Sequence, residues 1–459
     1  MYSTSATAQL CEIMLRDSAH IQMFEAEWRN RKAARSGGKL KEFVPLYDMD
    51  AAVNVCKQFV GCEYDRVYDI AEGIKIRFTD VGHLLGSASI EVWATEKTEN
   101  GDVTEKIVFS GDIGNINKPI IKDPKHVRDA DYVVMESTYG NRSHGGTPNY
   151  VEDLTDIFKR TFERGGNVVI PSFAVGRTQE LLYIIRKIKE DNLVGRDFDV
   201  YMDSPLAIEA TNIFVKNVES CFDDEAVELV RKGINPLSFP GLKYATTGDE
   251  SKQINFDPNP KVIISSSGMC EAGRIRHHLK HNLWRPECTI VFVGYQAVGT
   301  TGRIIVDGAE EIKLFGEPIQ IKAEIVQLKG SSGHADKDGL LCWINAFDTK
   351  PKKVFVVHGE DSVCDEFTEC LKEEYGYDAM APYTGGSYDL IADRVISEGV
   401  KERKTRRTTS TQRGKTVFDR LVAAGKRLMT VITHNEGGTN KDLAKFTDQI
   451  NALCDKWDR

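Results

Sequence analysis

Short apolar runs alternate with amphipathic helical stretches along most of the chain. In "GIKIRFTDVGHLLGSASIEVWAT", "EKIVFSGDIGN" and "ADYVVMESTYGNRSH", a strand-like run ends in a corner of small residues that carries His83, Asp112 and Glu136 respectively. Two later runs, "EIVQLKGSSGHAD" and "KKVFVVHGED", end in the same way at His334 and His358. Because this alternation is typical of sheets covered by helices, we predict an α/β fold.

The segment between about residues 165 and 310 repeats a pattern of its own. Three runs, "GGNVVIPSFAVGRTQELLYIIRKI", "NPKVIISSSGMCEAGRIRHHLKHNL" and "ECTIVFVGYQAVGTTGRIIVDG", each show a strand, then small residues, then Gly-Arg. This order is typical of the βα loops of a parallel sheet. We therefore predict a second α/β domain inserted into the first, so that polar corners before and after the insert meet in space.

Both ends of the chain predict helices. Thr4 or Ser5 can cap a helix whose apolar face carries Leu10, Ile13 and Met14, so regular structure is expected to begin there without a lead-in strand. Near the other end, "KERKTRRTTSTQRGK" holds seven Lys or Arg in fifteen residues, which indicates a solvated linker or a nucleic-acid contact. Beyond it, "VFDRLVAAGKRLMTVI" and "KDLAKFTDQINALCDKW" predict two amphipathic helices that dock on the body or on a partner.

Composition limits the class of protein. A chain of 459 residues exceeds what one hydrophobic core usually organises, so two or three domains are expected. Hydrophobic residues make up 41% and charged residues 28%, which excludes a wholly disordered chain. The net charge of -9 argues against nucleic-acid binding by charge over the whole surface, although a local basic groove is compatible with it.

Cysteine usage and hydropathy indicate a cytoplasmic protein. The ten cysteines contain no C-x-x-C pair, so neither a zinc ribbon nor a disulfide framework is indicated. No apolar run approaches the roughly 20 residues of a membrane span. The start, "MYSTSATAQLCEIMLRDSAH", lacks the basic-then-apolar order of a signal peptide. We expect reduced thiols and no membrane association.

The polar residues at the strand ends suggest a metal site. An aspartate that follows an apolar strand gives up part of its hydration, so Asp112 needs a backbone cap, an arginine or a metal ion as a partner. A single histidine is weak evidence for a ligand, but here five polar residues recur at the same topological place. Histidine nitrogen and aspartate oxygen are ligands preferred by zinc, and an aspartate can bridge two ions about 3.5–4 Å apart. The pattern therefore predicts metal binding at the strand ends.

Seven ordered motifs carry a family resemblance: "DVGHLLGSA", "FSGDIG", "ESTYGNR", "PSFAVGRTQELL", "SSSGMCEAGR", "SGHAD" and "VVHGE". Together they resemble the β-CASP branch of the metallo-β-lactamase fold, a branch of nucleic-acid-cleaving nucleases, from near residue 1 to about residue 390. The resemblance implies an incomplete αββα metallo-β-lactamase sandwich interrupted by a parallel α/β β-CASP domain. The implied metallo-β-lactamase domain has two parts, residues 1–160 and 313–395. The β-CASP domain lies between them at residues 161–312, and a basic linker with a helical tail follows at residues 396–459.

The resemblance also implies roles for the strand-end residues. His83 would bind a first zinc ion, Asp112 would bridge both ions, and His358 would bind the second. Glu136 and His334 resemble the family's catalytic acidic residue and its β-CASP histidine, the latter placed to protonate the leaving oxygen or to steady the scissile phosphate. The implied reaction is the zinc-dependent hydrolysis of RNA phosphodiesters, with single-stranded RNA in a groove under the β-CASP domain.

Two further sets of residues have alternative interpretations. Arg177, Arg274 and Arg303 could contact RNA phosphates in two-point geometry, or each could pair with a carboxylate inside the insert. In "RIRHHLKHN", His277 and His281 share a helix face. Without an H-E-x-x-H pattern, a surface or RNA-facing helix is favoured there over a second zinc site.

One motif of the family is missing from the sequence. None of the ten histidines begins H-x-H-x-D-H, which in the family lies upstream of the helix predicted here from about residue 6. Either the chain is a shortened form of an active nuclease, or it is a non-catalytic RNA-binding or scaffold relative. A small-molecule hydrolase is a third interpretation, disfavoured because the β-CASP segment is tied to nucleic-acid substrates.

The retained polar residues favour the shortened nuclease, since a decayed site has no physical reason to keep them at strand ends. In either case we expect the 459-residue chain to bind two zinc ions poorly and to cleave RNA weakly or not at all. We also expect exposed core surface, poor solubility and a possible homodimer through the tail.

Overall fold

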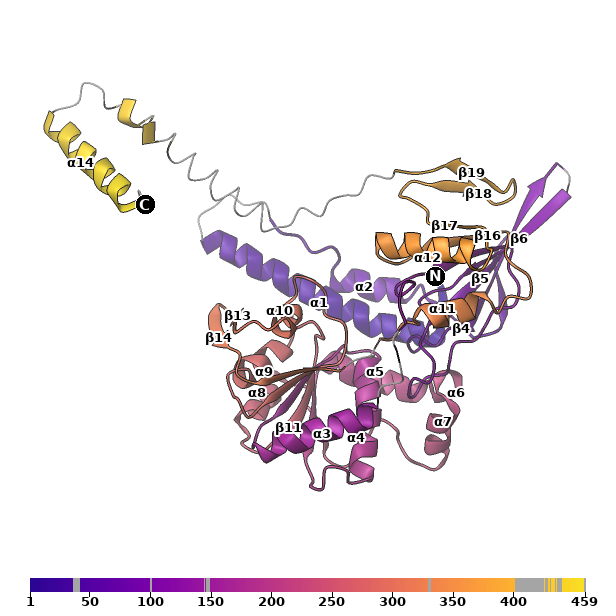
Figure 1. Cartoon of the computed structure of the whole chain (residues 1–459), viewed down its shortest axis with the longest axis horizontal. Coiled ribbons are helices and arrows are strands. Elements are labelled where there is room, and N and C mark those ends of the chain that lie inside the picture. The colour runs from indigo at the N-terminus through magenta and orange to yellow at the C-terminus, as the bar shows by residue number, and fades with distance from the viewer. Residues whose placement is uncertain are drawn as a thin grey trace. The chain divides into compact units, whose positions relative to one another are not determined.

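A computed structural model describes residues 1–35, 42–99, 101–143, 145, 149–328, 332–400, 425, 428–429, 431–433, 435 and 440–457. The chain divides into two units, residues 1–399 and 400–459 (Figure 1). In the second unit, the last predicted helix is present as α14 (Asn440–Trp457). The basic stretch 401–415 and most of the other predicted tail helix lie outside the described residues. No helix in the described part combines the length and apolarity needed to cross a membrane.

The first sheet has seven strands in the order β17-β16-β7-β6-β5-β4-β3. Their bounds are β3 (Val67–Ala71), β4 (Ile74–Asp80), β5 (Ala88–Thr98), β6 (Gly101–Phe109), β7 (Tyr132–Glu136), β16 (Lys353–Val357) and β17 (Ala379–Met380). Strands β6, β7 and β16 run parallel, and β5 is antiparallel to both β4 and β6. The carboxyl ends of β4, β6, β7 and β16 therefore meet at one edge of the sheet.

Both faces of this sheet are covered at the strands β7 and β16, which explains their nearly continuous apolar runs. In β16, Val354 and Val356 pack into a core with helices α11 (Lys337–Ile344) and α12 (Asp361–Glu373). The intervening Phe355 points to the other face, as the two-residue period of a strand requires. There it packs in a smaller cluster with Tyr388 and Leu390 of the hairpin formed by β18 (Ser387–Asp389) and β19 (Arg394–Ser397).

A buried ionic cluster, which we call the Glu91 cluster, joins three strands of this sheet. The fully buried carboxylate of Glu91 accepts hydrogen bonds from the Nε and an Nη of Arg77 at 2.7 and 2.6 Å, and from the Oγ1 of Thr79 at 2.8 Å. The ammonium of Lys106, on β6, lies 2.7 Å from it. Since a slip of one residue would turn these side chains to the opposite face, the cluster ties the registers of β4, β5 and β6 together.

The second sheet has six parallel strands in the order β10-β9-β11-β8-β12-β15. Their bounds are β8 (Val168–Pro171), β9 (Asp199–Asp203), β10 (Leu242–Tyr244), β11 (Lys261–Ser265), β12 (Thr289–Phe292) and β15 (Glu324–Gln327). The predicted parallel α/β insert is thus present. It extends beyond residues 161–312, because β15 follows that range yet pairs with β12.

Helices cover both faces of the second sheet. One core contains α3 (Tyr150–Glu163), α4 (Arg177–Glu190), α5 (Pro205–Lys216) and α7 (Asp224–Arg231), with α6 (Val218–Cys221) between the last two. The other contains α8 (Gly248–Phe256), α9 (Ile275–Asn282), α10 (Thr301–Val306) and the hairpin β13 (Glu311–Leu314) and β14 (Glu317–Gln320). A parallel sheet buried on both sides is the expected form of such a domain.

The first helix, α1 (Ser5–Arg35), is capped by Thr4 as predicted. The Oγ1 atom of Thr4 accepts a hydrogen bond from the backbone N–H of Thr7. The predicted absence of a lead-in strand is wrong. Strand β1 (Tyr2–Thr4) pairs in parallel with β2 (Val60–Cys62), a partner that only the tertiary fold brings near.

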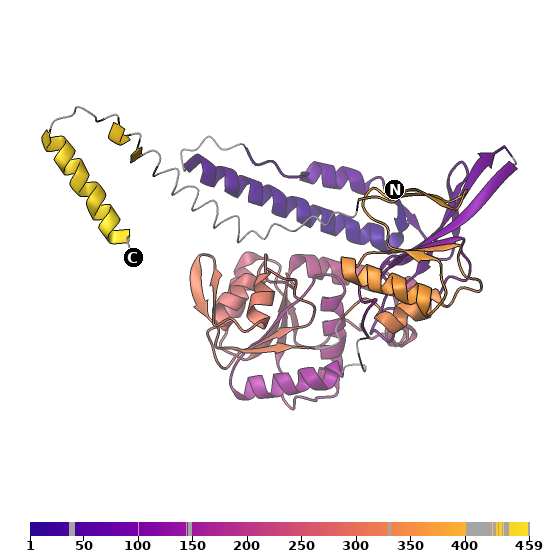
Figure 2. The ribbon, with the colours of Figure 1, turned by 45° about the horizontal axis from the view of Figure 1, so that its top comes forward.

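Helix α1 packs against α2 (Met49–Cys56) and α5. In both views it runs past the insert (Figures 1 and 2).

Candidate metal centre

Four polar side chains meet at the carboxyl edge of the first sheet. His83 lies in the loop between β4 and β5, Asp112 follows β6, Glu136 is the last residue of β7, and His358 follows β16 directly. The parallel direction of these strands brings together residues that are up to 275 positions apart in the sequence, since 358 − 83 = 275.

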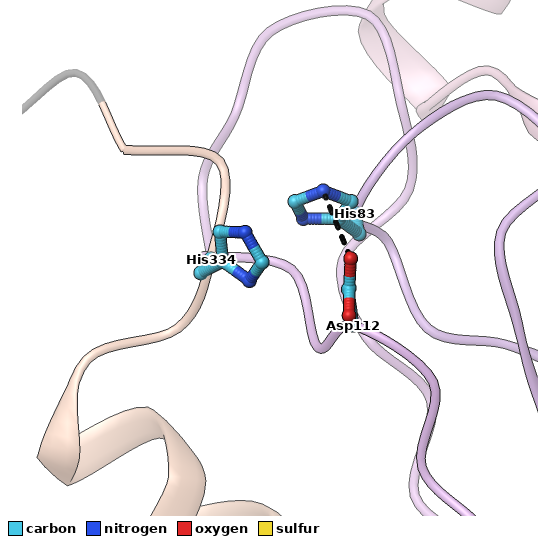
Figure 3. A group of neighbouring side chains, drawn as sticks. All are labelled: His83, Asp112 and His334. Carbon is cyan, nitrogen blue, oxygen red and sulfur yellow. Dashed lines mark ion pairs between the residues drawn. The ribbon is translucent and has the colours of Figure 1, made fainter. Parts of the chain in front are cut away.

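Asp112 is shared between two groups of potential ligands. One ligand atom each of His83, Asp112 and His334 lies within 4.8 Å of the others, and the same holds for Asp112, Glu136 and His358. The two carboxylate oxygens of Asp112 face different histidines, at 3.9 Å from His83 Nε2 and 3.5 Å from His358 Nδ1. Figure 3 shows His334 on a separate segment of the chain, with its ring turned toward His83 and Asp112. A carboxylate placed in this way can bridge two metal ions.

Glycines immediately before two of these residues shape the edge. Gly82 and Gly111 have φ angles of +64° and +61°. A Cβ atom on Gly82 would lie 2.6 Å from the carbonyl oxygen of Lys122, and one on Gly111 would lie 2.6 Å from that of Ala88. The small-residue corners seen in the sequence therefore serve close backbone approaches that a side chain would prevent.

The carboxylate that is truly buried at a strand end is Glu136, whose side chain is 1% exposed, whereas Asp112 keeps 40% of its side-chain surface exposed. Glu136 accepts a hydrogen bond from the backbone N–H of Ile113, and His334 Nδ1 lies 3.1 Å from its Oε2. Burial alone would raise the pKa of Glu136, but the hydrogen bond and charge of His334 lower it. Burial alone would lower the pKa of His334, but the hydrogen bond and charge of Glu136 raise it. Each side chain therefore favours the charged form of the other.

His83 has the properties of a metal ligand. Burial, together with the charges of His334 and Lys118, lowers the pKa of His83 to about 4, so its imidazole is neutral near pH 7, the form that coordinates metal. Its Nδ1 atom is buried and finds no hydrogen-bond partner in the described part of the chain. The other ring nitrogen, Nε2, faces the half-exposed carboxylate of Asp112 at 3.9 Å, and a neutral imidazole nitrogen beside a carboxylate and further histidines fits a zinc ion or a similar cation.

His334 reaches the site by a different route from the one expected. His334 was predicted to follow a strand, and the strand before it is β15, which belongs to the second sheet and not to the sheet that carries the other four residues. His334 instead forms an isolated antiparallel bridge with Gly114, next to the Asp112 corner. Periodicity showed a strand before His334, but it could not show to which sheet that strand belongs.

The three arginines of the insert each pair with a carboxylate. Arg177 contacts Glu180, Arg274 lies 2.7 Å from Asp203, and Arg303 lies 2.8 Å from Asp307: of the two interpretations, carboxylate pairing is the one observed. The helix of "RIRHHLKHN" presents His277 and His281 beside Phe315 and Phe256 respectively.

Sequence reasoning missed Lys118. Its Nζ donates a hydrogen bond to the carbonyl oxygen of His83 at 2.8 Å and lies 3.2 Å from Glu180 on α4. Both side chains are nearly buried, so Lys118 fastens the His83 loop to the insert. A lysine in the polar stretch "GNINKPI" gave no signal of this contact.

A cleft of about 2120 Å³ opens beside the metal centre. Its walls come from three parts of the first unit: the edge with His83 and His334, the insert, and helix α1. Arg177 and Arg274 also line it despite their carboxylate partners.

Comparisons with known proteins agree with this geometry. Two family models match, the Beta-Casp domain over residues 178–305 and the Zn-dependent metallo-hydrolase RNA specificity domain over residues 318–382. Ribonuclease TTHA0252 of Thermus thermophilus is 32% identical over 79% of this chain and 75% of the relative. Transcription termination factor FttA of Methanosarcina mazei is 32% identical over 76% of the chain but 54% of the relative. An RNase J-like protein of Methanocaldococcus jannaschii is 35% identical over 63% and 65%.

Proposed function

The chain belongs to the β-CASP family of metal-dependent RNA nucleases with the metallo-β-lactamase fold, and from this premise we propose that its metal centre hydrolyses RNA phosphodiester bonds. The observation that carries the proposal is the position of Asp112, whose two oxygens face His83 and His358. Its substrate class is supported by relatives that are named as ribonucleases, and by a family model described as an RNA specificity domain.

We assign His83, Asp112 and His358 as ligands of two zinc ions, with Asp112 shared. When bound, such ions lower the pKa of a coordinated water and neutralise charge on the phosphoryl oxygens. The protein's own contribution is to hold these groups at one sheet edge in a fixed arrangement, which the buried Glu136 supports through the backbone of Ile113.

Glu136 and His334 act as a pair in this proposal. Glu136 engages Nδ1 of His334, raises the pKa of the imidazole against the effect of its burial and orients the ring, and His334 itself lines the cleft. A protonated imidazole in this position can donate its proton to the leaving oxygen of the scissile bond. Glu136 is then a positioning residue, and His334 is the proton donor.

We further propose that residues 1–459 alone hold zinc weakly and cleave RNA slowly, because they contain no H-x-H-x-D-H segment to complete the ligand set. A second candidate function, a non-catalytic RNA-binding protein, is favoured by that same observation. The two differ in whether Asp112 matters for turnover.

The test is a zinc titration by calorimetry together with cleavage of a fluorescent single-stranded RNA, for the unaltered chain and for Asp112→Asn. We expect weak zinc binding and slow cleavage, both abolished by the substitution. Asp102→Asn, at an exposed position near the start of β6 and so at the end of that strand away from Asp112, is the matched control and should change neither. Two tightly held zinc ions with rapid turnover would contradict the proposed weakness, and RNA binding without zinc-dependent cleavage would establish the second function.

A further inference from the structure

Helix α1 forms a wall of the cleft that the metal centre does not use. Met14, Ile21, Phe24 and Trp28 all line the cleft, and Phe24 and Trp28 are 61% and 51% exposed. Spacings of three, four and seven residues place these side chains on one face of the helix. At 1.5 Å per residue, the row from Met14 to Trp28 is about 21 Å long. A continuous exposed row of large apolar side chains marks an interaction surface.

Aromatic rings in the cleft are accompanied by cations on each of its walls. On α1, the Nζ of Lys32 lies 5.0 Å from the centre of the Trp28 ring. After β7, the guanidinium of Arg142 lies 4.7 Å from the ring of Tyr139. On the insert, Arg276 lies 4.7 Å from the ring of Phe315 at the turn between β13 and β14. All six residues line the cleft, and we call them the three ring–cation pairs.

The cations of these pairs differ from the other arginines of the cleft. Arg177 and Arg274 have carboxylate partners. Over the described ranges of the chain, Lys32, Arg142 and Arg276 have no carboxylate oxygen within 4.0 Å, and the buried Nε of Arg276 has no hydrogen-bond partner. Their charge is therefore available to an anionic ligand.

We propose that the three ring–cation pairs form a track for unpaired nucleotides of RNA, an inference that rests on the proposed function. The rings of Trp28 and Tyr139 each offer a face on which one base can stack, and the neighbouring cation meets the adjoining phosphate. The Phe315 ring is already stacked with His277 at 4.4 Å, so the contribution of the insert is the phosphate contact of Arg276. Bases in a duplex are already stacked and paired, so the track selects single strands. Because every base has such a face, the track is tolerant of sequence.

Two observations favour RNA over a protein as the occupant. An apolar peptide or a second copy of the chain would leave the three cations buried without partners, which is costly. A polyanion would satisfy them, and the same cleft contains His83 and His334, so a strand that lies on the track continues into the hydrolytic centre.

The test measures binding separately from hydrolysis. A fluorescein-labelled oligouridylate is titrated with the full chain in EDTA, and the dissociation constant is read from fluorescence anisotropy. Loss of a base–aromatic stack weakens binding roughly 5- to 100-fold, so Trp28→Ala should show a loss of that size, and Trp28→Phe should retain most of the affinity. Trp284→Ala is the matched control, since Trp284 is 54% exposed and lies on the insert outside the residues that line the cleft.

The salt dependence of RNA affinity measures the contribution of the charges of the track. Lys32→Gln and Arg276→Gln should each reduce the slope of log affinity against log salt concentration by about 0.7, the value for one phosphate contact on a single strand. A duplex of the same length should bind the unaltered protein more weakly than the single strand, and Trp28→Ala should not change its affinity.

The outcomes separate this inference from the proposed function. If the unaltered chain binds the oligouridylate and Trp28→Ala binds it equally well, the track is overturned and hydrolysis at Asp112 still stands. If the unaltered chain binds no RNA in EDTA, the track is overturned, and if it binds none with zinc added either, the proposed function is overturned as well. If Trp28→Ala disrupts a homodimer and leaves RNA affinity unchanged, the face of α1 belongs to a second copy and the track is overturned. In cleavage assays Trp28→Ala should raise KM and leave kcat unchanged, whereas Asp112→Asn should abolish kcat.

Discussion

Replacing Glu91 by Ala should destabilise the first sheet strongly. The substitution removes the shared acceptor of Arg77, Thr79 and Lys106. Arg77 is 32% exposed and can regain water, but Lys106 is 6% exposed, and the carboxylate that it keeps among the described residues is the exposed Asp129. Breaking a buried ion pair by removing one member costs about 3–5 kcal/mol, and the remaining Asp129 places the expected cost near 3 kcal/mol.

Urea unfolding followed by far-ultraviolet circular dichroism measures this cost. Glu91→Ala should lower the midpoint without changing the slope, and adding Lys106→Met should restore part of the stability, because the uncompensated charge is then removed. Glu72→Ala, at an exposed position whose carboxylate pairs with the exposed Lys97, is the control and should cost less than about 1 kcal/mol. A cost below about 1 kcal/mol for Glu91→Ala, or no recovery in the double variant, would refute the view that the buried lysine dominates.

Three other predictions follow from the contacts around the cleft and the sheet. Burial raises the pKa of Glu91, but Arg77, Lys106 and Thr79 outweigh it and lower that pKa. The contribution of Glu91 to stability should therefore be complete above its unfolded-state pKa of about 4.3 and be lost as pH falls through its lower folded-state pKa. Glu91→Gln should reduce this acid sensitivity in unfolding experiments. Lys118→Met should lower zinc affinity roughly tenfold in calorimetry, because the His83 loop loses its support; Lys125→Met, an exposed lysine, should not. His334→Ala should reduce kcat more than RNA affinity, and an unchanged rate would remove its role as proton donor.

The family, the α/β class and the parallel insert were predictable from the sequence, and the family matches and the sheet topology confirm them. The convergence of His83, Asp112, Glu136 and His358 could be expected because each follows a strand, and parallel strands end at a common edge. Their roles stay predictions. Local patterns were sufficient here because strand direction alone determines where such residues meet.

Partners made by tertiary contacts were not predictable. The pairing of β1 with β2, the placement of β15 in the second sheet and the contact of Lys118 with His83 all join segments that are distant in the sequence. The same reason left the arginines undecided, since a Gly-Arg corner has one sequence pattern whether the guanidinium meets Glu180 or a phosphate. The sequence also did not show which carboxylate is buried. Asp112 was expected to lose its hydration, but the buried carboxylate is that of Glu136.

The chain connectivity around His334 couples the two sheets at the metal centre. His334 lies on the segment that leaves the sheet of the insert at β15 and enters the first sheet's layers at α11. The residue that meets Glu136 is therefore tied by the chain to the insert on one side and to the layers of the first sheet on the other. Its position at the metal centre depends on how the two sheets are held against one another, so a change at their boundary can act on the site without touching any of its side chains.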